Sequence, residues 1–334
     1  MNEDTIQSQY NIGIIGCGMV ATKAHLPALF SNPTESIDED GFRIIAACNR
    51  GEERLNHYKY KLPHIKIFRN YRDLIDSNLC DCLLIATGEE NHLEIAQYAL
   101  DQNLYILMEK PVSKSVEQIE NFINDNKNKF NKIQIGFNKR FYPGFLKFTE
   151  FKSNNTLSDI IGGSSFFSTS HGKGGILSNL IHQCDLICWI FGIPVDIKSH
   201  FSKIINNEKI GKTISASILT NTGAAVSLFF TSSSNWGTPY NETIEILDSQ
   251  KNRLSIRNSN EVIFSKFIDI ANSKNYIYNQ TNSVFWKPDL LGFKTQISQF
   301  YKLVIGKIET ASPNLIDGLI AQRLYEKILS FDDK

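Results

Sequence analysis

The chain has 334 residues, of which 42% are hydrophobic and 21% charged, so it is long enough for two ordinary globular domains. Its 35 basic residues balance 35 acidic ones, which gives no electrostatic reason to expect nucleic acid or an anionic membrane as a partner. No apolar run approaches the roughly 18 residues of a membrane span, and the first residues lack the pattern of a signal peptide, so we expect a cytoplasmic protein.

The first predicted element is a short apolar strand at residues 11–15, which runs directly into Gly16-Cys17-Gly18-Met19-Val20-Ala21. This is the dinucleotide-binding fingerprint with alanine at its third position. The first glycine permits a tight turn, and the second lets the backbone approach a pyrophosphate. The N–H groups at the start of the following helix, expected to run to about Phe30, would hold that group. We therefore predict that Gly16, Gly18, Met19 and Val20 bind the cofactor.

The second predicted strand, at residues 42–48, ends in Asn49-Arg50. An acidic residue at this place would bond the ribose hydroxyls and select NAD, whereas this chain has a neutral amide followed by a cation. Arg50 suits the 2′-phosphate of NADP, so we favour NADP over NAD and predict Asn49 and Arg50 as cofactor contacts. A solvated arginine that begins the next helix is the alternative.

Further strands at residues 82–86, 105–108 and 133–137 alternate with helices near 71–77, 92–102 and 115–128. This alternation predicts an α/β fold, with a Rossmann doubly wound parallel sheet in a first domain of residues 1–137. Thr87, in the turn after the fourth strand, is a candidate cofactor contact. His92 opens a helix and is a second candidate, although a capping or packing role explains it as well.

The strand that begins at Tyr105 stops abruptly in Glu109-Lys110-Pro111. Its apolar run is typical of a parallel strand that is buried on both faces. Ligands of open α/β sheets bind beyond the carboxyl ends of the strands, so Glu109 and Lys110 are predicted to lie beside the cofactor's reactive ring. The alternative is a solvated lysine in an ordinary strand-to-helix turn.

From about residue 138 the pattern changes to successive strands, which predicts a second α/β domain, 138–334, with a large, mostly antiparallel open sheet. The expected strands are 160–168, 195–204, 214–220, 224–231, 243–247, 253–256 and 262–267. Asn221-Thr222-Gly223 would form a tight hairpin, and two helices near 290–305 and 316–330 would close the chain. The apolar run 224–230 suits either a sheet face buried by a partner subunit or an ordinary core.

One helix, at residues 176–192, interrupts these strands and is apolar around most of its circumference. Ser178, His182, Asp185 and Trp189 share one stripe of it, because they are spaced by four, three and four residues. His182 could exchange protons near neutral pH, with Asp185 to orient it. A purely structural histidine is the alternative reading.

Six cysteines, at positions 17, 48, 80, 82, 184 and 188, show no zinc-site spacing. We expect reduced, buried thiols and no metal.

Taken together, these segments resemble the glucose–fructose oxidoreductase / inositol dehydrogenase / rhizopine-catabolism (Gfo/Idh/MocA) family of NAD(P)-dependent oxidoreductases. The resemblance rests on the order and spacing of the glycine motif, Glu109-Lys110-Pro111, residues 136–141, Gly174-Gly175 with His182-Gln183-Cys184-Asp185, and residues 317–321. It implies a Rossmann domain joined to an open-sheet domain, and a homodimer or homotetramer formed through that sheet.

The resemblance also implies residue roles. Lys110 corresponds to the lysine that binds the reacting hydroxyl or carbonyl, and His182 to the proton donor and acceptor; the Lys-Pro bond is typically cis. Related inositol dehydrogenases have an aspartate where this chain has Ser178. That departure puts the proton relay in doubt, with Asn179 and Asp185 as possible replacements.

The expected activity is hydride transfer between nicotinamide and a secondary alcohol or ketone of a sugar, polyol or sugar nucleotide. Candidate substrate contacts are Lys110, Arg140, Tyr142, Ser178 and His182. Residues His171, Lys173 and Trp236 are further candidates, and like Arg140 and Tyr142 they are not distinguishable from ordinary loop residues. Two alternatives stay open: a cofactor-binding regulator without turnover, and an NAD-assisted glycoside hydrolase. Turnover of added nicotinamide separates the first reading from both.

Overall fold

A computed structural model describes residues 10–30, 41–169, 175–206, 209–232, 240–268, 273–279 and 292–331. The chain divides into two compact units, residues 1–138 with 285–319 and residues 139–284 with 320–334. The predicted boundary after residue 137 lies one residue from the first division. Residues 285–319, however, were predicted in the second domain and group with the first, because Phe293, Ile297 and Phe300 are buried in the first unit's core.

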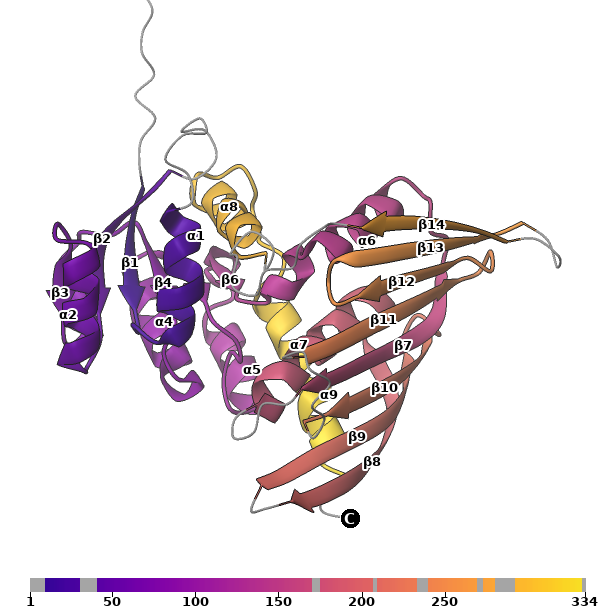
Figure 1. The fold of residues 1–334 in the computed structure, drawn as a ribbon. Coiled ribbons are helices and arrows are strands. Elements are labelled where there is room, and N and C mark those ends of the chain that lie inside the picture. The colour runs from indigo at the N-terminus through magenta and orange to yellow at the C-terminus, as the bar shows by residue number, and fades with distance from the viewer. Residues whose placement is uncertain are drawn as a thin grey trace, which may run out of the picture. The chain divides into compact units, whose positions relative to one another are not determined.

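The first unit is built on a six-stranded sheet in the order β3-β2-β1-β4-β5-β6, with every pairing parallel (Figure 1). This is the strand order of a doubly wound dinucleotide-binding fold, as predicted. The strands are β1 (Tyr10–Ile15), β2 (Phe42–Cys48), β3 (Lys66–Phe68), β4 (Cys82–Ile85), β5 (Tyr105–Met108) and β6 (Ile133–Ile135).

The helices that connect these strands are α1 (Leu26–Phe30), α2 (Glu52–Lys61), α3 (Tyr71–Asp76), α4 (His92–Asp101) and α5 (Val116–Asp125). Helix α8 (Phe293–Val304), from near the end of the chain, belongs to the same unit. A π-helical turn, Ala21–His25, leads into α1. Side chains cap two of the helices: Asn70 accepts the N–H of Arg72 at the start of α3, and Ser115 accepts that of Gln118 at the start of α5.

The second unit is built on an eight-stranded sheet in the order β14-β13-β12-β11-β7-β10-β9-β8. Only the pairing of β7 with β10 is parallel, so the prediction of a mostly antiparallel sheet is confirmed. The strands are β7 (Ile160–Thr169), β8 (Pro194–Asn206), β9 (Lys209–Thr220), β10 (Ala225–Thr231), β11 (Tyr240–Asp248), β12 (Arg253–Arg257), β13 (Glu261–Phe267) and β14 (Ser273–Asn279).

Helices α6 (Pro143–Ser153) and α7 (Gly175–Phe191) pack against strands of this sheet, and α9 (Leu315–Leu329) follows at the end of the chain (Figure 1). The predicted hairpin joins β9 to β10, where Gly223 has a φ of +84°. Residues along β10 alternate in exposure: Val226, Leu228 and Phe230 are buried, whereas Phe229 is 39% exposed. The ring of Phe229 stacks on that of Phe166 in the neighbouring strand, 5.4 Å between centroids.

The six cysteines are free thiols, and all are buried except the half-buried Cys188, as predicted. Among the helices in the described residues, none has both the length and the apolar character that crossing a bilayer requires.

Candidate functional site

The two glycines of the turn after β1 are required for different reasons. Gly16 has a φ of +95°, and a Cβ there would lie 2.4 Å from the carbonyl oxygen of Ala86. A Cβ on Gly18 would meet nothing closer than 3.9 Å, the Nη1 atom of Arg54. The fold itself therefore excludes a side chain at Gly16, whereas Gly18 leaves open space beside the backbone.

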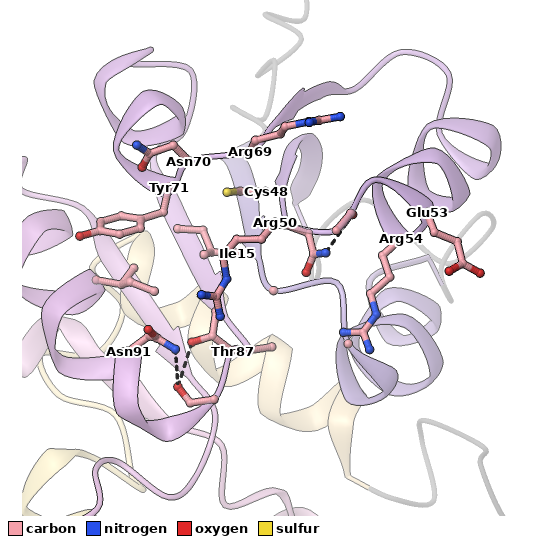
Figure 2. A pocket seen from close by; sticks show the side chains of 17 residues that line it. Ile15, Cys48, Arg50, Glu53, Arg54, Arg69, Asn70, Tyr71, Thr87 and Asn91 are labelled. Atoms are coloured by element: carbon pink, nitrogen blue, oxygen red, sulfur yellow. Dashed lines mark hydrogen bonds between the residues drawn. The ribbon is translucent and has the colours of Figure 1, made fainter.

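That space is a cavity of about 850 Å³, a size typical of ligand pockets (Figure 2). Its walls come from the segments that follow four neighbouring strands, β3, β2, β1 and β4. The strand order reverses between β1 and β4, and ligands of open α/β sheets bind outside the carboxyl ends of strands at such a reversal.

Half of the predicted cofactor contacts line this cavity. They are Gly16, Gly18, Asn49, Arg50 and Thr87. The other half are absent from its lining, namely Met19, Val20, His92, Glu109 and Lys110. Sequence reasoning missed several lining residues, which come from helices or from the segment after the short strand β3: Arg54, Arg69, Asn70, Tyr71 and Asn91.

The cavity is rich in arginine, and two of the guanidinium groups have no partner among the described residues. Arg50 and Arg54 extend into the cavity in Figure 2, and within the described part of the chain neither makes a hydrogen bond or ion pair. Arg69 is paired with Glu52 at 2.6 Å. These cations, beside a turn that leaves room at Gly18, fit the phosphates of a dinucleotide.

Neutral polar groups support the turn, and one carboxylate, that of Glu53, is also part of the cavity lining. The Asn49 side chain accepts the N–H of Cys17 at 3.3 Å and donates to the carbonyl of Gly51 at 3.0 Å, so it holds the glycine turn in place. Burial, together with the proximity of Cys48, raises the pKa of Cys17 to about 12, and burial likewise raises the pKa of Cys48 to about 12. Both thiols therefore stay neutral near pH 7.

Around Lys110, the structure shows a cluster of buried polar groups. Lys110 itself is half-buried after β5, and the Lys110–Pro111 bond is cis, as the resemblance implies. Glu109 and His92, predicted as cofactor contacts, are instead buried. Glu109 bonds His25 at 2.6 Å, and His92 contacts the carbonyl oxygens of Pro111 and Thr87. The role of His25 was not foreseen.

The charge on Glu109 is stabilised by this cluster. Burial favours the neutral acid, but the hydrogen bond from His25 and the electrostatic interactions with His25, Lys110 and His92 outweigh it and hold the pKa of Glu109 below its ordinary value.

In the second unit, α7 carries His182 and Asp185 into a buried environment. Asp185, predicted to orient His182, accepts three hydrogen bonds from Arg140 at 2.5 to 3.1 Å. The Arg140 guanidinium also lies 5.3 Å from the ring centroid of Trp189. Arg140 and Tyr142, predicted as substrate contacts, are 4% and 6% exposed. The Ser178 side chain, His171, Lys173 and Trp236 lie outside the described residues.

A second buried ion pair lies in the same unit. Lys139 contacts Glu242 at 2.5 Å, with side chains 6% and 1% exposed. The other groups on Glu242 are the amide of Gln183 and the hydroxyl of Ser259, and Ser165 in turn donates to Gln183. Sequence patterns indicated none of these contacts, because the partners come from distant segments.

Comparison with known proteins identifies a family and relatives that this chain resembles. Residues 10–137 match the model of an oxidoreductase family with an NAD-binding Rossmann fold, Gfo/Idh/MocA. Inositol 2-dehydrogenase of Salmonella typhimurium is 24% identical over 189 residues, 53% of each chain, and myo-inositol 2-dehydrogenase of Thermotoga maritima is 25% identical over 210 residues, 60% of each. The chain thus spans about half the length of the Salmonella relative that it matches.

Among solved structures, levoglucosan dehydrogenase in complex with NADH superposes with a TM-score of 0.83. The likeness covers 97% of this chain and 96% of that one at 16% identity, so it concerns the fold. The family whose model residues 10–137 match is the one that the sequence motifs resemble, so the resemblance predicted from the sequence is confirmed.

Proposed function

From this match, we propose that the chain transfers a hydride between a nicotinamide cofactor and a secondary alcohol or ketone of a sugar, polyol or sugar nucleotide. The observation that carries the proposal is the cationic cavity at the glycine turn, in a segment that matches an NAD-binding oxidoreductase family. The substrate class is supported by the relatives, which are named as inositol dehydrogenases.

Two residues carry the proposed chemistry. The nicotinamide supplies the redox chemistry when it is bound. Neutral His182 takes the proton of the substrate hydroxyl during oxidation and returns it during reduction. The ammonium of Lys110 stabilises the negative charge that develops on the reacting oxygen. The pair of Arg140 and Asp185, one helical turn from His182, keeps this part of α7 in place.

For the cofactor, we favour NADP over NAD. No acidic residue stands at the end of β2, and the Asn49 amide is already occupied in holding the glycine turn. Arg50 and Arg54 are suitably charged for a 2′-phosphate, because neither is neutralised by a carboxylate of the described residues.

We further infer a homodimer or homotetramer formed through the sheet of the second unit. Leu219, Phe229 and Leu247 lie on one face of this sheet and are 39% to 44% exposed. The strand register shows this: Leu219 pairs with Ala225, which pairs with Gly162, which pairs with Leu247. Phe229 pairs with Phe166, four residues along the same two strands from Ala225 and Gly162. Several exposed apolar side chains on one face of a sheet are consistent with a subunit interface. Light scattering of wild type and Phe229→Glu checks this: the variant should shift toward monomer, and a monomeric wild type would contradict the inference.

The test of the activity is a panel of sugars, polyols and nucleotide sugars assayed with NADH, NADPH and their oxidised forms. We expect turnover with at least one pair, and a Lys110→Ala variant that loses about 100-fold or more in kcat with unchanged cofactor affinity. Near-normal rates in that variant would remove Lys110 from the mechanism. Binding of both cofactors without any turnover would favour a regulator instead.

A further inference from the structure

Two buried histidines contact the residues on either side of Lys110. His25 is bonded to the side chain of Glu109, and His92 to the backbone of Pro111. Both imidazoles are essentially inaccessible to solvent, with exposed fractions of 0% and 1%. Lys110 is thus the middle residue of a segment whose two neighbours are each held from the protein interior.

The contact before Lys110 is a charge-assisted hydrogen bond. Because ionised Glu109 can only accept, Nε2 of His25 is the donor across the 2.6 Å distance. The His25 ring packs edge-on against Phe293, 4.8 Å between centroids, and its Nδ1 is buried with no hydrogen-bond partner in the described residues. The other oxygen of Glu109 accepts the N–H of Lys110 at 3.3 Å. The carboxylate therefore joins the π-helical turn to the backbone of Lys110.

The contact after Lys110 reaches the cofactor cavity. Nδ1 of His92 lies 2.8 Å from the carbonyl oxygen of Pro111, and Nε2 lies 3.2 Å from that of Thr87. Thr87 lines the cavity. Carbonyl oxygens only accept hydrogen bonds, and a neutral imidazole has a single N–H, so the His92 ring donates to one of the two. The shorter contact indicates that the acceptor is the carbonyl of Pro111. His92 links a wall of the cavity to the residue after Lys110.

We propose that His25 and His92 are positioning residues that fix Lys110 against the reacting oxygen, His25 through Glu109 and His92 through Pro111. This inference rests on the proposed function, since it takes Lys110 as the group that contacts the substrate. Such support matters because a misplacement of about 1 Å can cost about 100-fold in rate, and lysine has a flexible four-carbon stem.

Three substitutions of His92 separate its two contacts. His92→Phe keeps a ring but has no donor. The amide nitrogen of asparagine sits where Nδ1 was, and that of glutamine sits near the place of Nε2. We expect His92→Phe and His92→Gln to lower kcat at least tenfold, His92→Asn to stay within threefold of wild type, and the cofactor Kd to change less than threefold in all.

The matched control is His64→Phe, which removes an imidazole contact to a backbone carbonyl, Ile44 O at 3.3 Å, elsewhere in the same unit. It should leave kcat unchanged. Equal rates in the asparagine and glutamine variants would overturn the assignment for His92, even if the phenylalanine variant does not fold.

A second readout needs no substrate. The rate at which acetic anhydride labels Lys110, measured by mass spectrometry relative to exposed Lys61, reports how firmly Lys110 is held. We expect at least a threefold rise in His92→Gln and in Glu109→Gln, with none in His64→Phe. Unchanged labelling in both variants would overturn the positioning role. Raised labelling in a protein that turns over no substrate would leave that role intact and defeat the proposed function alone.

Discussion

The cations of the two units are used differently. In the first unit, Arg50 and Arg54 line a cavity and have no anionic partner among the described residues. In the second unit, Lys139 and Arg140 are at most 6% exposed at their side chains and are matched to Glu242 and Asp185 at 2.5 Å. One cation of each pair, Arg50 and Arg140, was predicted from the sequence as a ligand contact.

The difference shows how the role of a basic residue depends on whether it is buried or lines a cavity. A buried charge is tolerated only with a partner, so the partners of Lys139 and Arg140 are requirements of the fold. A cation left unpaired at a cavity costs little, because water solvates it until an anion binds. Unpaired cations at the cavity therefore point to a ligand, and the following substitutions separate the two situations.

The largest expected effect is on stability in the second unit. Asp185→Ala leaves the Arg140 guanidinium buried without its carboxylate, and we expect a loss of about 3 to 5 kcal/mol in the free energy of unfolding. The matched control is Glu52→Ala, which breaks the exposed pair with Arg69 and should cost less than about 1 kcal/mol. Urea denaturation measures both. Equal losses of stability in the two variants would mean that the buried pair of the second unit is no more important for the fold than the exposed pair of the first.

The next effect divides the two glycines of the cavity. Gly16→Ala places a Cβ against a backbone oxygen at a positive φ, so we expect a loss of about 2 kcal/mol or more. Gly18→Ala should change stability by less than about 0.5 kcal/mol, yet weaken cofactor binding at least tenfold, since its Cβ enters free space beside the turn. Unchanged binding in Gly18→Ala would show that the cofactor does not approach there.

A smaller effect concerns cofactor choice. Arg50→Ala should weaken NADPH about tenfold or more relative to NADH, about 1.4 kcal/mol, while the stability of the cofactor-free protein stays the same. Titration of each cofactor by fluorescence gives the two affinities. An equal loss for both would place Arg50 at the pyrophosphate and end the NADP preference.

The fold was largely readable because strand and helix periods and turn residues are local. Missed elements have local reasons: β3 is three residues long with Lys66 and Ile67 exposed, so it lacks a buried apolar run. Helix α8 belongs to the first unit because Phe293 and Phe300 pack into a core formed by residues from the beginning of the chain. No local sequence pattern encodes that contact.

The site was predictable only where a motif forces the backbone. Gly16 and Gly18 follow from the turn itself, and Arg50 from its place after β2. Tyr71 reaches the cavity from the start of α3, and the His25–Glu109 bond joins residues 84 positions apart. Contacts of that kind depend on tertiary packing, and one sequence without its relatives carries no sign of them.

The smallest effect is a pH dependence in the segment that holds Lys110. Burial lowers the pKa of His92 below 6.5, although the carbonyls of Pro111 and Thr87 and the charges of Glu109 and Glu89 oppose this. Near pH 6.5, His92 is therefore protonated in the unfolded chain and still neutral in the folded one. Protonation thus favours the unfolded state, and the stability contributed by neutral His92 is lost as the pH falls below 6.5.

Comparing His92→Asn with wild type isolates this contribution, because the other histidines cancel in the difference. Between pH 7.5 and 5.5 the wild type should lose up to about 1.4 kcal/mol more than the variant in urea denaturation. The depressed pKa of Glu109 acts only below about pH 4.5, outside this window. If His92→Asn instead lost more stability than the wild type over this pH range, the His92 ring of the folded wild type would be charged and would donate to both carbonyls. The two contacts would then act together to hold Lys110.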